Sequence, residues 1–184
     1  MKFKHENTRL QIKYSCKLKC NRCTAQNRAG RRCKNTVCIG TDVCHVHRKS
    51  LGLRVGGSLI PNAGKGLFAT KVFRKNEVIG FYAGKAITTQ QKNERYGADS
   101  TVPYMIDGTT GMHIDSACLR SLMSIANGSP FKTRSNAKFS TRPMGDGTVK
   151  VTATDRLNVG DEIIIFYGPL YFQGMPYSVH STTR

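Results

Sequence analysis

Short apolar runs separated by glycine-rich turns fill the sequence after residue 50, and this pattern predicts a series of short β-strands. The run Ile163-Ile164-Ile165-Phe166 is the most apolar in the chain and is expected to be buried. The expected strands are Leu53–Ile60, Gly66–Ala69, Glu77–Tyr82, Asn136–Ser140, Thr148–Thr154 and Glu162–Tyr167. The second part of the chain is therefore expected to be mainly β.

A hairpin and two short helices interrupt this series. Tyr104–Asp107 and Met112–Asp115 flank the turn sequence Gly-Thr-Thr-Gly, which predicts a β-hairpin. Thr88–Tyr96 is polar, begins with threonine caps and ends before Gly97, so it predicts a short helix. Leu119–Ala126 predicts another short helix that ends at Asn127-Gly128.

The composition changes near Ser50. Residues 1–54 contain 14 Lys or Arg and 2 Asp or Glu, so most of the net charge of +18 lies in the first third of the chain. Such a segment attracts nucleic acid, although a solubilising basic tail has the same composition. We expect a basic Cys/His-rich segment over 1–50, a second domain over 51–173 and a tail over 174–184.

The first residues do not have the pattern of a secretory signal. Met1–Cys20 carries a Lys or Arg every few positions and has no apolar core. No run approaches the ~18 apolar residues of a membrane span. We therefore expect a soluble, intracellular protein that is not secreted, with no membrane partner. In a reducing compartment, cysteines serve as metal ligands and free thiols more readily than as disulfides.

Six of the seven cysteines lie within Cys16–Cys44, and four residues there have the spacing of a metal site. Cys23-x9-Cys33-x10-Cys44-x2-His47 supplies three thiolates and an imidazole, which suit one tetrahedral Zn²⁺. Cys20-x2-Cys23 is an equally good ligand pair, and Cys16 and Cys38 lie nearby. A different combination of these ligands, a second metal site and free thiols without metal therefore stay open as alternatives.

The stretch 23–33 resembles a small cysteine–histidine knuckle that is common in proteins of large DNA viruses. That resemblance implies a virus of eukaryotes as the source, with the host nucleus or a virus factory as the location.

Four motifs follow one another in the second part, and each alone fits an ordinary turn, core strand or helix cap. The first motif is Ala63–Ala69, which contains Gly-Lys-Gly, and the second is Ile79–Gly84. The third consists of three pieces, Tyr104–Asp107, Ile114–Ser116 and Ser124–Ser129, and the fourth is Gly160–Gly168. Two glycines around one residue let the backbone approach a ligand closely. No third glycine opens a helix, so a dinucleotide fingerprint is excluded.

In this order and spacing the motifs resemble the SET-domain family over residues 51–173. Tyr82-Ala83-Gly84 is similar to the family's "EYxGE" strand, Ser124–Ser129 to its "RFINHS" and Gly160–Gly168 to its "GEELTYDYG". The resemblance implies the SET-domain β-clip fold with a pseudoknot, mainly β with short helices. It implies a lysine methyltransferase that uses S-adenosylmethionine.

The resemblance also assigns roles to residues. Tyr167 would be the catalytic tyrosine, and Tyr104 and Tyr82 would wall the lysine channel. Residues implied in cofactor binding are Gly64, Lys65, Gly66, Leu67, Tyr104, Asn127, Gly128, Tyr167 and Phe172. The expected substrate is a protein lysine on an extended histone tail, and the basic front segment could grip nucleosomal DNA beside it.

Several positions depart from the family's pattern. Ser124 replaces its arginine, Gly128 its histidine and Ile165 an aromatic residue. An aliphatic side chain at 165 implies room for more than one methyl group or a degraded site. A catalytically impaired SET-like binding module and a zinc-containing nucleic-acid-binding protein therefore stay open as alternatives.

Overall fold

The computed structural model describes residues 20–37, 43, 44, 46, 47, 51–98, 102, 104–108, 111–140 and 148–172. The chain divides into two compact units, each built from three segments. The first comprises Met1–His47, Phe81–Ser124 and Ser140–Lys150, and the second Arg48–Gly80, Ile125–Phe139 and Val151–Arg184. The boundaries expected from composition stay predictions, and the 174–184 tail lies outside the described residues.

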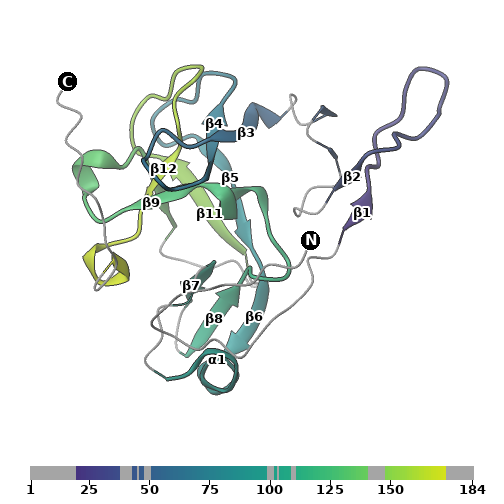
Figure 1. Ribbon diagram of the computed structural model, residues 1–184. Coiled ribbons are helices and arrows are strands. Elements are labelled where there is room, and N and C mark those ends of the chain that lie inside the picture. Colours follow the sequence, from purple (N-terminus) through teal and green to yellow (C-terminus); the bar gives the residue numbers. More distant parts are fainter. Residues whose placement is uncertain are drawn as a thin grey trace. The chain divides into compact units, whose positions relative to one another are not determined.

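The first unit contains two small antiparallel sheets. Strands β1 (Asn21–Arg22) and β2 (Thr36–Val37) pair at the base of a long loop. Strands β6 (Lys85–Thr88), β8 (Met112–Asp115) and β7 (Met105–Asp107) form a three-stranded sheet in that order. The pairing of β7 with β8 confirms the predicted hairpin. Helix α1 (Thr89–Tyr96) lies beside β6 and β8 (Figure 1).

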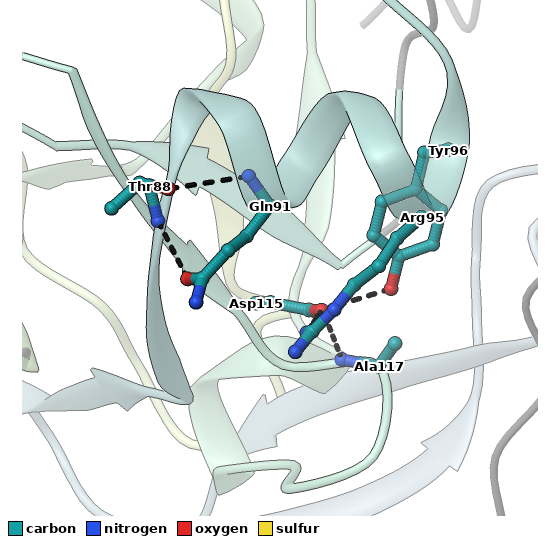
Figure 2. A network of polar contacts seen from close by, with 6 residues as sticks. All are labelled: Thr88, Gln91, Arg95, Tyr96, Asp115 and Ala117. Atoms are coloured by element: carbon teal, nitrogen blue, oxygen red, sulfur yellow. Dashed lines mark hydrogen bonds and ion pairs between the residues drawn. The ribbon is translucent and has the colours of Figure 1, made fainter.

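Helix α1 begins where the sequence predicts it, at a capping box. The Thr88 hydroxyl accepts from the Gln91 amide nitrogen at 3.2 Å, and the Gln91 side chain accepts from the Thr88 amide at 3.0 Å (Figure 2). The backbone amides of Thr88 and Gln91, which have no acceptor within the helix, each find a side-chain acceptor in this way. The helix ends before Gly97, whose φ of 89° suits glycine.

Asp115 fixes the other end of α1 to the sheet. Its Oδ2 accepts from Arg95 Nη1 at 3.0 Å and from the Tyr96 hydroxyl at 2.9 Å, and its Oδ1 accepts from the Ala117 amide at 2.9 Å (Figure 2). The Asp115 side chain is 2% exposed and that of Arg95 is 19% exposed. A carboxylate so deeply buried needs these donors to offset its lost hydration.

The second unit contains an antiparallel pair and most of a five-stranded sheet. Strand β3 (Leu53–Gly57) pairs with β4 (Lys65–Ala69). The sheet has the order β5 (Val78–Ala83), β11 (Thr148–Ala153), β10 (Ala137–Phe139), β12 (Ile164–Phe166) and β9 (Asn127–Ser129). The chain passes from one unit to the other within β5 and within β11.

Strand β12 is the centre of the second unit. It lies between β10 and β9 and runs parallel to both. The segment before it pairs with β4, since the Ile163 amide donates to the Leu67 carbonyl at 2.7 Å. Ile163 and Ile165 are fully buried, whereas Ile164 and Phe166 are half-buried. The expected burial of the apolar run is therefore complete on one face of the strand and partial on the other.

The structure corrects the expected elements in two places. The region expected as a helix at Leu119–Ala126 holds only a 3-10 turn, η2 (Leu122–Ile125), and the Asn127–Ser129 segment after it is strand β9. Strand β6 was not expected. Two further 3-10 turns are η3 (Lys132–Arg134) and η4 (Pro169–Phe172). Among the described residues, no helix has the length and apolarity to cross a membrane.

Candidate functional sites

The glycine turn between β3 and β4 presents open backbone. The Ser58 amide donates to the Gly64 carbonyl at 2.9 Å and closes the turn. Asn62 and Gly64 adopt positive φ angles of 62° and 72°. The space beside the α-carbon of Gly64 is open, because a β-carbon there would meet no described residue beyond its chain neighbours within 4 Å. A ligand can therefore approach the backbone of this turn closely.

Asn127, at the start of β9, connects the glycine turn to the later motifs of the sequence. Its side-chain nitrogen lies 3.0 Å from the Lys65 carbonyl, 3.0 Å from Ser58 Oγ and 3.0 Å from Glu162 Oε1. Three segments that are distant in sequence thus meet at one amide group. Because amides have fixed planar geometry, Asn127 holds the turn and β9 in a defined relation.

Glu162 is the anchor of this cluster, and the sequence pattern did not single it out. Its Oε1 accepts from the Ser58 hydroxyl at 2.7 Å, and its Oε2 accepts from the Leu59 amide at 2.6 Å. The residue is 7% exposed. A β-carbon at Gly66 would overlap the Glu162 carboxylate, so the second glycine of the Gly-Lys-Gly motif makes room for this anchor.

Tyr167 directly follows β12 and packs against Gly128 of β9. The Tyr167 hydroxyl donates to the Ala126 carbonyl at 3.0 Å. A β-carbon at Gly128 would overlap the Tyr167 ring, so the absence of a side chain at 128 gives the ring its place. Residue 128 is the position at which the sequence departs from the family's histidine.

Three other aromatic rings surround Tyr167. Phe139 lies 5.9 Å from it and Phe172 6.4 Å from it, both stacked, and Tyr171 lies 5.0 Å away with its edge toward the ring. Tyr171 and Phe172 belong to η4, and Phe172 is one of the residues that the resemblance implies in cofactor binding. The cluster holds Tyr167 in one orientation.

Eight of the predicted site residues belong to the second unit, and two belong to the first. Gly64, Lys65, Gly66, Leu67, Asn127, Gly128, Tyr167 and Phe172 are in the second unit, and Tyr82 and Tyr104 are in the first. Tyr82 is 2% exposed. Tyr104 is half-buried, adopts a φ of 61°, and has the Arg120 guanidinium 3.7 Å from its ring centroid. The roles given to these ten residues stay predictions.

The four residues expected to bind zinc come together in the structure. The ligand atoms of Cys23, Cys33, Cys44 and His47 all lie within 4.8 Å of one another. Cys33 Sγ is 3.9 Å from Cys44 Sγ, and His47 Nδ1 is 3.3 Å from Cys44 Sγ. Zn–S bonds of about 2.3 Å in a tetrahedron place the sulfurs about 3.8 Å apart, so the cluster fits one Zn²⁺.

Hydrogen-bond donors favour the thiolate forms of Cys44 and Cys23. At Cys33 the Asn35 backbone hydrogen bond lowers the pKa, but burial and the neighbouring thiols of Cys44 and Cys23 outweigh it, so the pKa of Cys33 is raised. Hydrogen bonds from the Asn35 side chain and from His47 lower the pKa of the Cys44 thiol to about 5. Burial raises the pKa of Cys23, but backbone hydrogen bonds from Cys44 and Ala25 outweigh burial, so its pKa is lowered. Metal ligation requires the thiolate, and Asn35 acts as the outer partner that steadies it.

Two other cysteines correct the expectation of free thiols. Cys20 and Cys118 are disulfide-bonded. Cys20 is absent from the Cys/His cluster found among the described residues, which disfavours the alternative ligand pair Cys20-x2-Cys23. Cys16 and Cys38 lie outside the described residues.

Comparison with known proteins gives a family and a fold. The SET domain family matches residues 64–168. No curated protein matches the chain. An active polycomb repressive complex 2 in the stimulated state shares 23% identity at a TM-score of 0.55, covering 63% of this chain and 15% of that chain.

Two further solved structures give the same result. The first is ctPRC2 in an autoinhibited conformation bound to S-adenosylmethionine, with 22% identity and a TM-score of 0.54, covering 64% of this chain and 15% of that chain. The second is Chaetomium thermophilum polycomb repressive complex 2 bound to GSK126, with 22% identity and a TM-score of 0.55, covering 66% of this chain and 17% of that chain. The protein thus spans less than a fifth of these chains, and the likeness establishes a shared fold. Since the family match covers more than half of the sequence, the chain belongs to the SET-domain family.

Proposed function

We propose that this protein is an S-adenosylmethionine-dependent protein lysine N-methyltransferase that acts on a histone tail. The observation that carries the proposal is the meeting of the glycine turn, Asn127 and Tyr167 in one unit, joined through the Lys65 carbonyl and the Ala126 carbonyl. These are the motifs that the SET-domain resemblance relates to the cofactor and the reacting amine. Family membership supports methyl transfer as the reaction.

The residues present suit S-adenosylmethionine. The exposed Gly64 backbone and the exposed Lys65 side chain at the glycine turn suit the carboxylate of its amino-acid end. Aromatic rings of η4 suit an adenine face. When bound, the cofactor supplies a methyl group on a positively charged sulfur.

The chain's own part in the reaction is alignment and desolvation. A lysine amine has a reference pKa of ~10.4 and must lose its proton before it attacks. Removal from water and a nearby positive charge both favour the neutral amine, so a strong general base is not required. The Tyr167 hydroxyl, fixed by the Ala126 carbonyl and by the ring cluster, would orient the amine by accepting from it on the hydroxyl oxygen.

The zinc site would have a structural role. Three thiolates and one imidazole complete a tetrahedron, so no position is left open for a reacting water. The β1–β2 pair has little apolar core beyond Cys23, Val37 and Cys44, and bound metal would supply much of the folding free energy there. We further propose that this basic segment contacts nucleosomal DNA and brings the histone tail near.

Transfer of labelled methyl groups to mixed histones tests the enzyme proposal. We expect label on one histone in the presence of full-length protein. Tyr167→Phe retains the ring packing and loses the hydroxyl, so it should reduce transfer at least tenfold while leaving the fold intact. Cofactor binding without any transfer would favour the impaired binding module, and no cofactor binding would favour a purely nucleic-acid-binding protein.

A further inference from the structure

We define the knuckle hairpin as residues 20–37, which comprise β1, β2 and their connecting loop. Its cationic side chains fall into two groups. Arg22 and Arg32 hold the hairpin together. Arg22 donates to the Cys33 and Arg32 carbonyls at 2.9 and 3.1 Å, and Arg32 donates to the Cys23 and Arg22 carbonyls at 2.9 and 2.7 Å. These two side chains are therefore committed to the fold.

Three other cations in the hairpin have no such commitment. Arg28, Arg31 and Lys34 are exposed, and in residues 20–37 no hydrogen bond or ion pair holds their side chains. Fixing a charged side chain costs conformational entropy, and no hydrogen bond or ion pair with a described residue offsets that cost here. Their positions are thus free to serve a ligand.

The backbone that carries these cations is well defined. Asn27 Oδ1 accepts from the amides of Ala29 and Arg31, each at 3.0 Å. The Gly30 amide donates to the Asn27 carbonyl at 2.9 Å, and Gly30 adopts a φ of 70°. A closed turn of this kind fixes the backbone positions from which Arg28 and Arg31 extend, unlike a solubilising tail.

A hollow of about 470 Å³ lies among these groups, next to the zinc ligands. Its wall includes the cations Arg31, Arg32 and Lys34, the amide side chains of Gln26 and Asn27, and His47. Among the residues that the structure describes, no acidic side chain lines it. Guanidinium, ammonium and amide donors are the groups with which proteins contact phosphates.

We propose that the knuckle hairpin binds duplex DNA, with a backbone phosphate in the hollow between Arg31 and Lys34 and a second phosphate near Arg28. This deepens the DNA contact of the proposed function and assigns it to three residues. A two-stranded β-ribbon is a shape that the major groove of B-DNA admits. The described wall of the hollow lacks the large apolar side chains that would anchor an acidic peptide.

The test compares two double variants of the zinc-loaded full chain at a series of salt concentrations. Arg31→Gln with Lys34→Gln removes the proposed phosphate contacts. Lys75→Gln with Lys138→Gln removes the same charge from exposed positions outside the hairpin. Each lost phosphate contact should reduce the slope of log Kobs against log salt by about 0.9. We expect the hairpin pair, which contacts one phosphate, to lower the slope by about 1 and duplex affinity at least tenfold, with the control pair close to wild type.

Three outcomes would overturn the proposal: equal losses in both pairs, an unchanged slope in the hairpin pair, or tighter binding of single-stranded RNA through the same residues. Zinc content shows whether the hairpin pair keeps its fold. If it loses zinc, the single variant Arg28→Gln, whose side chain touches no fold partner among residues 20–37, is measured instead and should lower the slope by about 1. Methyl transfer to a free histone-tail peptide should be unchanged. If the protein binds DNA as proposed but transfers no methyl group to the peptide, the enzyme proposal is contradicted and the DNA-binding proposal is not.

Discussion

Gly128 and Tyr167 form a matched pair, and their match explains a departure that looked damaging in the sequence. Family members carry a histidine where this chain has Gly128, one of the departures that left an impaired binding module open as an alternative. Here the Tyr167 ring occupies the space that any side chain at 128 would need. The Tyr167 ring can therefore take its observed position only with glycine at 128, and introducing the family's histidine there should displace the ring.

Gly128→Ala and Gly128→His should both reduce methyl transfer, the second more severely. A displaced ring loses the hydrogen bond from its hydroxyl to the Ala126 carbonyl. We expect kcat/KM to fall at least tenfold for alanine, equivalent to about 1.4 kcal/mol of transition-state stabilisation. Gly57→Ala is the control, because a β-carbon at Gly57 meets nothing within 4 Å. Wild-type rates in Gly128→His would show that the ring overlap has no consequence.

Glu162 offers a second prediction at this scale. In Glu162→Gln, an amide NH2 group replaces one carboxylate oxygen. This NH2 would face the Leu59 amide or the Ser58 hydroxyl, and because both are donors in the structure, one donor would lose its acceptor. An unsatisfied buried donor costs about 1–3 kcal/mol. The free energy of unfolding in urea should fall by that amount. Glu94→Gln, at an exposed helix position, should leave it within about 0.5 kcal/mol.

The site residues differ in how far the sequence could identify them. The meeting of Cys23, Cys33, Cys44 and His47 was predictable because Cys and His carry their chemistry in their identity and spacing. Glu162 was not, since the sequence places it at the start of an expected strand, where nothing nearby marks its carboxylate as an anchor. Its partner Ser58 lies 104 residues away. Only the pairing of β4 with the segment before β12 brings the two together, and no local pattern encodes that pairing.

The elements show the same division between local and distant causes. Helix α1 and the β7–β8 hairpin were predictable because caps and turn glycines act within a few residues. Strand β9 was not, because Asn-Gly-Ser has a low strand propensity. It is a strand because β12 pairs with it in parallel. The neighbouring η2 is correspondingly short, and tertiary pairing overrides the helical pattern there.

Removal of the α1 cap should destabilise the first unit by a modest amount. Thr88→Ala deletes the acceptor for the Gln91 amide and breaks the capping box. Loss of a threonine cap typically costs about 1 kcal/mol. Thermal unfolding should show a decrease of several degrees, whereas Thr133→Ala, at an exposed position of η3, should have little effect. An unchanged midpoint for Thr88→Ala would mean that packing on Asp115 alone sustains the helix.

The knuckle hairpin should depend on metal as a unit. We expect one zinc per chain, lost in Cys44→Ser and retained in Cys38→Ser, as measured by metal analysis of purified protein. Chelation should accelerate amide hydrogen exchange across residues 20–37, because the hairpin has little core of its own. Retention of zinc by Cys44→Ser together with loss by Cys38→Ser would show that a different set of ligands binds the metal.

At the scale of the whole chain, charge and chemistry have separate locations. The first 54 residues carry most of the net positive charge, and the residues that the SET-domain resemblance relates to methyl transfer lie beyond them. The SET-domain resemblance concerns residues 51–173 alone and implies an active site for a peptide lysine. A chain organised in this way can gain affinity for a nucleosome through its front segment without a change in the catalytic residues.

Deletion of residues 1–50 should therefore lower methylation of nucleosomes more than methylation of a free histone-tail peptide. The peptide presents no duplex phosphate, so its rate reports on the catalytic part and on whether the shortened chain folds. Counterion release makes the DNA contribution fall steeply with salt, so the difference between the two substrates should be largest near about 50 mM salt and should shrink toward about 300 mM. Equal losses on both substrates at every salt concentration would mean that the front segment supports the fold rather than DNA contact.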